Sequence, residues 1–507
     1  MKAEPSILKS VALTVAMRWT DRLIAFLSTI ILARLLVPAD FGIVAQGYMV
    51  IGLISTVIDL GVGLALIQNR EATPDHYNTA WTMRIGEAIC IALVIFLAAP
   101  LAGNYFHEPR VVPVMRLLGA GTVLASFENM WVVSFQKEMR FGLDFQFAFL
   151  KRFSGFAVTV VLAAAFQSYW ALVAGALSST VIGVAISYRL HRGRPRLSIS
   201  RLGELFAFSQ WALVRSIGNY LLVELHRLLV GGRSSTATLG AYSLATDIST
   251  MPSTELLAPL YRALFPAFVQ AKKNPEEVKR IYLLAQGLQT MLVIPASAGL
   301  ALVASEGVAI LLGQKWTMVV PFLQVLALVE MGNAVLTGSG YILITMGGIC
   351  RSATIAWVQV LSFAVGAFVL FPNAGALQLA WLRLASVMCG VVAAIWAIRG
   401  VLPGLRTTHI TNQIWRPVLA TVVMAVVLVS LDRGMAVPVF LALLTKMFVG
   451  TVVYTLTLMG FWALSGRPIG AETYAMDKIS TFWNRLRRAR SDVTVTGATR
   501  SMKRRVS

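Results

Sequence analysis

The sequence predicts an all-α polytopic membrane protein of about fourteen transmembrane helices, in which two six-helix halves are followed by two further helices. Three observations support this fold class. The 507 residues are 57% hydrophobic and 13% charged, and their mean hydropathy of +0.73 is far above that of a soluble globular domain. Apolar stretches near the length of about 20 residues that crosses a bilayer recur along the chain. An internal repeat relates the first of these stretches to the seventh.

The apolar stretches divide the chain into spans of similar length. They lie at about residues 13–33, 41–64, 80–101, 113–134, 147–166, 169–188, 206–226, 237–258, 281–302, 317–338, 352–371, 376–398, 416–431 and 437–464. The thirteenth is short. An even number of spans places both termini on the same side of the membrane.

The distribution of Lys and Arg predicts which side that is. With a cytoplasmic N-terminus, 31 of the 44 Lys and Arg fall in tails and cytoplasmic loops, 7 in the outer loops and 6 within spans. Positive charge is characteristically retained on the cytoplasmic side, so we expect both termini there. This loop bias also explains the net charge of +21 without a nucleic-acid partner.

These boundaries predict five parts of the chain. They are an N-terminal six-helix lobe (1–190), a basic cytoplasmic linker (191–205), a C-terminal six-helix lobe (206–400), two appended helices (401–466) and a basic cytoplasmic tail (467–507).

The repeat appears when the chain is shifted by 193 residues. Arg22 to Val37 then lies on Arg215 to Val230, and seven of the sixteen positions are identical. After a five-residue insertion, Phe41-Gly42 lies opposite Leu239-Gly240, where each second helix begins. Both copies start on the cytoplasmic side, so an axis along the membrane normal should relate the two halves.

Short motifs in a fixed order carry a resemblance to a family. They are Ala33-Arg34-Leu-Leu-Val-Pro38-Ala-Asp-Phe-Gly42, Asp59-Leu-Gly61-Val-Gly63, Gln68-Asn-Arg70, Phe106-His-Glu-Pro109, Phe135-Gln-Lys-Glu-Met-Arg-Phe141, Leu239-Gly-Ala-Tyr-Ser-Leu-Ala245, Leu264-Phe-Pro-Ala-Phe268 and Gly313-Gln-Lys-Trp316. In this order they resemble the polysaccharide flippases of the Wzx type, within the multidrug/oligosaccharidyl-lipid/polysaccharide exporter superfamily. The resemblance covers most of the chain.

The resemblance implies a fold and an activity. The fold would be MATE-like, with two six-helix lobes around a central cavity. The activity would be alternating-access export of a polyprenyl-pyrophosphate-linked oligosaccharide repeat unit across a bacterial inner membrane, for exopolysaccharide or lipopolysaccharide synthesis. The partners would be this lipid-linked oligosaccharide, membrane lipids, and the polymerase and chain-length components of the pathway. Where relatives often carry an acidic residue before the Arg or Lys of the helix-seven copy, this chain has His226.

Arginines within the spans are the candidate substrate-binding residues, because charge at membrane depth is costly and is usually functional. Arg22 and Arg215 are equivalent under the repeat, and Arg18 lies one turn before Arg22. Guanidinium groups stay charged and pair bidentately with phosphate oxygens, so these residues suit a pyrophosphate. The alternative is structural, with Asp21 neutralising an arginine of its own helix.

Two further arginines complete this set. Arg84 lies three residues before Glu87, so the two could neutralise each other. Arg383 has no carboxylate nearby in the sequence and needs a partner from another helix or from substrate.

Acidic residues in and near the spans are the candidates for coupling transport to H⁺ or Na⁺. They are Asp21, Asp59, Glu87, Glu128, Glu224, Asp247 and Glu330. Two have structural alternatives, because Glu224 lies three residues before Arg227 and Asp59 could cap the Gly-rich end of the second span.

No catalytic or metal-binding motif appears in a credible context, so the chain is predicted not to be an enzyme and to need no cofactor beyond a coupling ion. The alternatives are a multidrug or cation antiporter or a peptidoglycan-precursor lipid flippase of the same superfamily. Deep arginines argue against the antiporter. A polysaccharide polymerase is also considered, although the longest predicted outer loop, of about fifteen residues, is short for an enzyme that holds two sugar substrates.

Overall fold

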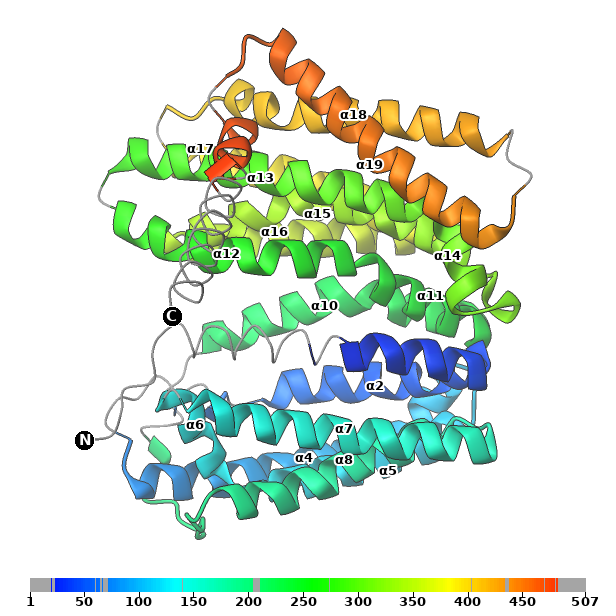
Figure 1. Ribbon diagram of the computed structural model, residues 1–507. Helices are drawn as coiled ribbons and strands as arrows, with labels where there is room; N and C mark the ends of the chain where they lie inside the picture. The colour runs from blue at the N-terminus through cyan, green and yellow to red at the C-terminus, as the bar shows by residue number, and fades with distance from the viewer. Residues whose placement is uncertain are drawn as a thin grey trace, which may run out of the picture. The chain divides into compact units, whose positions relative to one another are not determined.

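A computed structural model describes residues 20, 23–59, 61–63, 66, 72–138, 140–203, 210–272, 274–402, 404–433, 437–468, 470–478 and 480–481. Within these ranges the chain is helical and contains no strand (Figure 1). The candidate residues Arg18, Asp21 and Arg22 lie outside the described ranges, as does the tail beyond residue 481.

The described helices follow one another along the chain in this order. After an apolar helix at Leu23–Leu35, the first half contains α2 (Pro38–Ile58), α4 (Pro74–Tyr105), α5 (Val111–Ser126), η1 (Met130–Val132), α6 (Val133–Lys137), α7 (Phe141–Phe166) and α8 (Trp170–Leu190). The second half contains α10 (Gln210–Arg233), α11 (Thr236–Ser249), α12 (Met251–Ala271), α13 (Pro275–Leu302), α14 (Ala304–Leu311), η2 (Gln314–Trp316), α15 (Val319–Thr345), α16 (Ile349–Val365), η3 (Gly366–Leu370), α17 (Ala376–Arg399), α18 (Thr407–Asp432) and α19 (Val439–Leu464).

Ten helices in the described ranges are long and apolar enough to cross a membrane. Backbone N–H and C=O groups find no partners in lipid, and a helix satisfies them internally. The protein is therefore a multi-pass, all-helical membrane protein. The total of fourteen spans remains a prediction.

Several predicted spans have different ends in the structure. The seventh, placed at 206–226, continues as α10 to Arg233, so His226 lies inside the helix and not at its end. The eighth, placed at 237–258, is interrupted at Thr250, because Pro252 in the first turn of α12 cannot donate a backbone hydrogen bond. The fourth, placed at 113–134, ends as α5 at Ser126, and the Asn129 side chain caps the following turn.

The helices pack into two compact units that are not continuous in the sequence. Unit 1 is formed by Met1–Ile248, Ala304–Leu326 and Ala356–Cys389, and unit 2 by Ser249–Val303, Ala327–Ile355 and Gly390–Ser507. The five parts predicted from the sequence, with lobes at 1–190 and 206–400, remain a prediction.

Within unit 1, α2 and α11 cross at two glycines that are equivalent in the repeat. A Cβ added at Gly42 would overlap the backbone carbonyl oxygen of Thr236, and a Cβ added at Gly240 would overlap that of Pro38. Pro38 and Thr236 are themselves equivalent, so the two contacts exchange under the repeat. An approximate two-fold axis therefore passes between the starts of α2 and α11.

Exchanged contacts also join the two halves elsewhere in unit 1. Trp316 Nε1 donates to the Ala33 carbonyl oxygen and Lys315 Nζ to that of Arg34, both at 2.7 Å. Tyr105 Oη, at the end of α4, donates to the Leu228 carbonyl oxygen of α10 at 3.3 Å. Side chains of each half thus contact backbone carbonyl groups near the end of the first helix of the other half.

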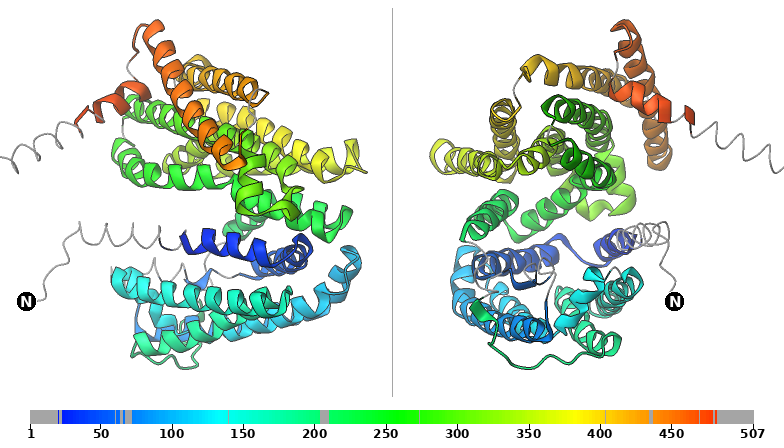
Figure 2. Two further views of the ribbon diagram at one scale, coloured as in Figure 1. Left: turned by 45° about the vertical axis from the view of Figure 1, so that its right-hand side comes forward. Right: turned by 90° about the vertical axis from the view of Figure 1, so that its left-hand side faces the viewer.

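Unit 2 is built around α13, α18 and α19. The pairs α13 and α18, and α18 and α19, lie side by side (Figures 1 and 2). Tyr454 Oη on α19 donates to the Met291 carbonyl oxygen on α13 at 2.7 Å. The 26 residues of α18 exceed the short thirteenth span, 416–431, predicted from the sequence.

Candidate functional site

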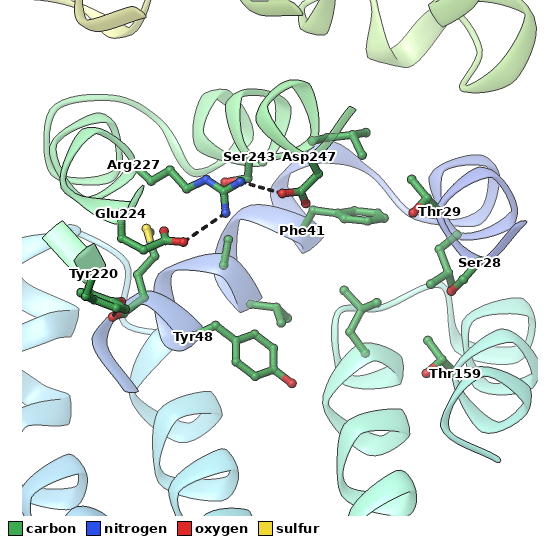
Figure 3. Close-up of a pocket in the computed structure, with 17 residues that line it drawn as sticks. Ser28, Thr29, Phe41, Tyr48, Thr159, Tyr220, Glu224, Arg227, Ser243 and Asp247 are labelled. Atoms are coloured by element: carbon green, nitrogen blue, oxygen red, sulfur yellow. Dashed lines mark hydrogen bonds and ion pairs between the residues drawn. The ribbon is translucent and has the colours of Figure 1, made fainter. Parts of the chain in front are cut away.

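Unit 1 contains a partly open cavity of about 490 Å³, lined by polar and apolar side chains, between the Leu23–Leu35 helix and α2, α7, α8, α10 and α11 (Figure 3). Its hydroxyl-bearing lining residues are Ser28, Thr29, Tyr48, Thr159, Tyr220 and Ser243. Its ionisable lining residues, within the described ranges, are Glu224, Arg227 and Asp247. A few hydroxyl and charged groups in a cavity between apolar helices are typical of a ligand-binding site.

Arg227 holds the two carboxylates together. Its Nη2 lies 2.6 Å from Asp247 Oδ1 on α11, and its Nη1 lies 3.5 Å from Glu224 Oε1 one turn earlier on α10 (Figure 3). The side chains of Arg227 and Glu224 are each 17% exposed, whereas that of Asp247 is 64% exposed. The carboxylate of Asp247 is therefore the most accessible charge of the cluster.

The local sequence explains this arrangement. The i,i+3 spacing places Glu224 and Arg227 on one face of α10. Asp247 lies in the last turn of α11. Only two residues separate the end of α10 at Arg233 from the start of α11 at Thr236, so the chain turns back and Asp247 reaches Arg227 on α10. Tyr220, one turn before Glu224, donates its hydroxyl to the Met49 carbonyl oxygen and so fixes α10 against α2.

Three buried polar atoms around the cavity lack a hydrogen-bond partner among the described residues. They are Arg227 Nε, Glu224 Oε2 and Ser243 Oγ. Buried polar groups in proteins are nearly always satisfied, so an unsatisfied group calls for an explanation such as a ligand or water. Each of these three atoms exposes almost no surface, so a ligand in the cavity could reach them only if neighbouring side chains moved.

The predicted arginines lie at several places. Arg215 belongs to α10, and the structure describes the helix there but not this side chain. Arg84 is half-buried on α4, with Nη1 3.9 Å from Met130 Sδ. Arg383, on α17, borders a small cavity together with His226 of α10. Neither Arg84 nor Arg383 lines the cavity around Arg227.

The predicted acidic residues are also divided among several places. Asp247 and Glu224 line the cavity. Asp59, at the C-terminal end of α2, accepts a 2.8 Å hydrogen bond from the backbone N–H of Gly61 in the following turn. Glu128 pairs with Lys151 at 2.7 Å, and Glu87 lies half-buried on α4.

Glu330 belongs to unit 2 and is 6% exposed. It accepts hydrogen bonds from Ser253 Oγ and, at 2.8 Å, from Asn333 Nδ2. Glu330 is therefore buried and hydrogen-bonded, whereas the side chain of Asp247 is 64% exposed.

Arg227 is the central residue that the sequence identifies only as a partner of Glu224. The predicted seventh span ends at residue 226, which leaves Arg227 outside it. Two signals could have identified this residue: its equivalence to Arg34 in the repeat, and a second acid, Asp247, in the next predicted span.

Several known proteins are similar to this chain in sequence. A family model described as polysaccharide biosynthesis protein matches residues 31–321, which include most of the cavity lining. The lipopolysaccharide biosynthesis protein WzxC of Escherichia coli is 25% identical over 60% of this chain and 63% of its own length, less than two thirds of that relative. The succinoglycan biosynthesis transport protein ExoT of Rhizobium meliloti is 24% identical over 86% of this chain and 89% of its own.

The fold is also found among solved transporters. A structure of the lipid II flippase MurJ in an inward closed conformation aligns with a TM-score of 0.72 over 89% of this chain and 99% of that chain, at 9% identity. An inward-facing multidrug resistance MATE family transporter aligns with a TM-score of 0.54 over 75% and 94%, at 17% identity. At these identities the likeness is one of fold. Because the family model covers more than half of the chain, this multi-pass membrane protein belongs to the polysaccharide biosynthesis protein family.

Proposed function

We propose that the protein is a flippase that moves a polyprenyl-pyrophosphate-linked oligosaccharide from the cytoplasmic to the outer face of a bacterial inner membrane, by alternating access. The observation that carries this proposal is the cavity of unit 1, where charged and hydroxyl-bearing side chains gather among apolar helices. Charged groups among apolar helices are costly even when they pair with one another, so they typically mark a path for a substrate or an ion.

The relatives support a substrate of this class. WzxC is described by lipopolysaccharide biosynthesis and ExoT by succinoglycan transport, so polysaccharide synthesis is common to both descriptions. These relatives are described by biosynthesis or transport and not by a catalysed reaction, consistent with a protein that moves a substrate without changing it.

The remaining roles complete the proposal. Arg22 and Arg215 bind the pyrophosphate, with Arg18, Arg84 and Arg383 as further contacts along the path. One or more of the acidic residues bind H⁺ or Na⁺. Both termini face the cytoplasm, where the lipid-linked unit is assembled, and the polymerase and chain-length components receive it on the outer side.

Deletion of the gene tests the proposal in cells. Without the protein, and with no second flippase present, surface polysaccharide should be lost and radiolabelled lipid-linked repeat units should accumulate on the cytoplasmic side. A plasmid copy should restore both. Intact polymer synthesis in the deletion strain would refute the assignment, and accumulation of a drug or of peptidoglycan precursor instead would favour an alternative transporter.

A further inference from the structure

We propose that residues 191–203, called the strap below, lie at the membrane–water interface and bind anionic phospholipids of the bilayer. The strap is the described part of the predicted basic linker. The chain leaves α8 in an extended conformation at His191, and residues 191–199 form neither helix nor strand. The partner is the lipid of the membrane itself, so the proposal does not depend on the flippase function.

Hydrogen bonds hold the strap on unit 1. Three of its backbone N–H groups donate to side chains of α4: Arg196 to Asn78 Oδ1 at 2.9 Å, Ser198 to Thr82 Oγ1 at 2.9 Å and Arg201 to Thr79 Oγ1 at 3.3 Å. Closer to α8, Asn129 Nδ2 donates to the Gly193 carbonyl oxygen at 2.7 Å. The His191 ring also stacks on Trp131, with ring centroids 5.4 Å apart. These contacts place the strap along the first turns of α4.

The length of α4 places these turns at the level of the lipid headgroups. Its 32 residues extend over about 48 Å, whereas the hydrocarbon core of a bilayer is about 30 Å thick. The apolar span predicted here begins at residue 80, and Thr82 lies only about 12 Å from the start of the helix. Tyr77 of α4 stacks on Trp131 with ring centroids 4.3 Å apart, and Tyr and Trp are enriched at membrane interfaces.

Three apolar side chains of the strap are exposed. Leu197 is 73% exposed, Ile199 is 71% exposed and Leu202 is 44% exposed. Single exposed apolar residues are common on protein surfaces, but these three lie within six residues. At the level of the headgroups they can enter the boundary between headgroups and acyl chains, which removes their apolar surface from water.

The charged side chains of this segment are all basic. Residues 189–203 contain five Arg and no Asp or Glu. Arg189, Arg192 and Arg196 are exposed. Each basic residue close to an anionic membrane surface strengthens binding about fivefold. Exposed basic and apolar side chains on one segment suit a phospholipid, whose phosphate meets the arginines and whose acyl chains meet Leu197 and Ile199.

Arg194 has a structural role and provides a control. Its Nη1 donates to the carbonyl oxygens of Tyr188 at 3.0 Å and His191 at 2.9 Å, so it satisfies backbone groups at the end of α8. The guanidinium also lies 5.4 Å from the centroid of the Tyr188 ring. The Arg194→Gln variant should therefore melt at a lower temperature than the wild type in every lipid.

Thermal unfolding of the purified full-length protein, in a neutral detergent titrated with phosphatidylglycerol or phosphatidylcholine, tests the preference for anionic lipid. Phosphatidylglycerol should raise the melting temperature of the wild type more than phosphatidylcholine does, and high salt should weaken this effect by screening charge. The Arg192→Gln/Arg196→Gln variant should need roughly 25-fold more phosphatidylglycerol for half of the stabilisation, since each arginine contributes about fivefold.

A second double variant is the matched control for net charge. Arg280→Gln/Arg433→Gln removes two exposed positive charges from unit 2 and leaves the strap intact. It should respond to phosphatidylglycerol at the same concentrations as the wild type.

A nitroxide label at residue 197 tests whether the strap reaches the bilayer. The label is attached to Leu197→Cys after the native Cys90, Cys350 and Cys389 have been replaced by Ser, and the protein is reconstituted in vesicles that contain phosphatidylglycerol. Collisions of the label with lipid-soluble oxygen should exceed collisions with a water-soluble nickel chelate. A label at Arg280→Cys, on an exposed residue of unit 2, should show the reverse.

Three results would overturn the proposal. They are equal stabilisation of the wild type by the two lipids, an unchanged response of the Arg192→Gln/Arg196→Gln variant to phosphatidylglycerol, and a label at residue 197 that collides mainly with the water-soluble chelate. The last result would instead identify the strap as a surface for a soluble partner protein.

Discussion

Arg416 of α18 and Glu472 of the helical segment after α19 form a deeply buried ion pair in unit 2. Arg416 Nε lies 3.0 Å from Glu472 Oε1, and the two side chains are 4% and 3% exposed. Removing one partner of such a pair leaves an uncompensated buried charge. We therefore predict that Glu472→Gln lowers the free energy of unfolding by about 3–5 kcal/mol, measured as a fall in melting temperature in detergent.

An exposed pair provides the control for this prediction. Arg280 and Glu277 lie 2.6 Å apart, with side chains 71% and 38% exposed. Solvent screens pairs of this kind, so Glu277→Gln should barely change the melting temperature. An equally small effect of Glu472→Gln would show that the buried pair does not stabilise the C-terminal segment.

Arg215 is the cleaner probe of the proposed pyrophosphate contact, because its repeat equivalent, Arg22, has Asp21 beside it. Loss of a charge-assisted hydrogen bond worth about 1.5–3 kcal/mol predicts at least tenfold slower flipping by the Arg215→Ala variant, if the contact forms in the rate-limiting state. The Arg215→Lys variant keeps the charge without the planar fork, so it should restore flipping only partly.

Turnover must be normalised to the amount of folded protein in the membrane. Unchanged flipping by a well-expressed Arg215→Ala protein would exclude the paired-arginine site. Full activity of the Arg215→Lys variant would indicate a general requirement for positive charge in place of a bidentate contact.

At the scale of single residues, the sequence identifies the charged side chains that lie within predicted spans. It identifies the residues that those side chains contact less well. Glu224 and Asp247 are recognisable as membrane-depth acids, and both line the cavity. Their joint partner Arg227 lies outside the predicted span, because α10 continues beyond it through a Gly-Gly pair. The ring of Tyr105 packs so closely against Gly232 that a Cβ there would overlap it. Periodicity does not reveal such a contact between distant segments.

Among the helices, the crossing of α2 and α11 depends on Gly42 and Gly240. A methyl group at either position would overlap a backbone carbonyl oxygen of the other helix, and backbone cannot move aside as a flexible side chain can. Overpacking of this kind typically costs about 1–3 kcal/mol. We predict that Gly42→Ala and Gly240→Ala each lower the melting temperature, and by similar amounts because the two contacts are equivalent.

Gly86 on α4 is the matched control, since a Cβ there would meet no atom within 4 Å. Alanine favours a helix over glycine by about 1 kcal/mol, so Gly86→Ala should keep or raise the melting temperature. If Gly42→Ala were as stable as Gly86→Ala, the close crossing of the two helices would be wrong.

The turn between α4 and α5 predicts a pH dependence of stability. Glu108 accepts hydrogen bonds from Arg110 Nε at 2.8 Å and Nη2 at 2.7 Å, and from Thr236 Oγ1 on α11 at 3.2 Å. The hydrogen bonds from Arg110 hold the pKa of Glu108 below its usual range. A carboxylate whose pKa is depressed by folding stabilises the fold above its unfolded pKa, and this contribution is lost as the pH falls through the folded pKa.

Melting temperatures measured between about pH 6 and pH 3 test this contribution. The wild-type protein should be more stable than the Glu108→Gln variant at the upper end of the range, and the difference should shrink toward the lower end. A constant difference across the range would show that the charge of Glu108 does not stabilise the turn.

The ends of the helices are harder to predict than their presence. Hydropathy locates α18 but underestimates its length, because polar residues such as Asn412 and Gln413 precede its apolar part. The break between α11 and α12 follows from Pro252, although the surrounding residues are apolar enough to suggest one continuous span.

For the molecule as a whole, the apolar composition and the motif order suffice to predict a multi-pass helical membrane protein of the polysaccharide biosynthesis family. The repeat predicts that Gly42 and Gly240 are equivalent, and the structure brings both to one crossing. The family resemblance implies a central cavity, but the sequence does not identify the residues that line the cavity around Arg227. Its walls come from six helices whose packing depends on contacts between segments far apart in the sequence.

A flipping assay with reconstituted protein decides whether the chain moves lipid-linked oligosaccharide. Purified protein in proteoliposomes should move a fluorescently labelled polyprenyl-pyrophosphate oligosaccharide between leaflets, so that an enzyme or quencher added outside reaches substrate that was inside. Empty liposomes and liposomes with the Arg215→Ala variant should show much slower exposure of the label. Exposure by the wild-type protein no faster than in empty liposomes, with and without a gradient of H⁺ or Na⁺, would contradict the proposed function.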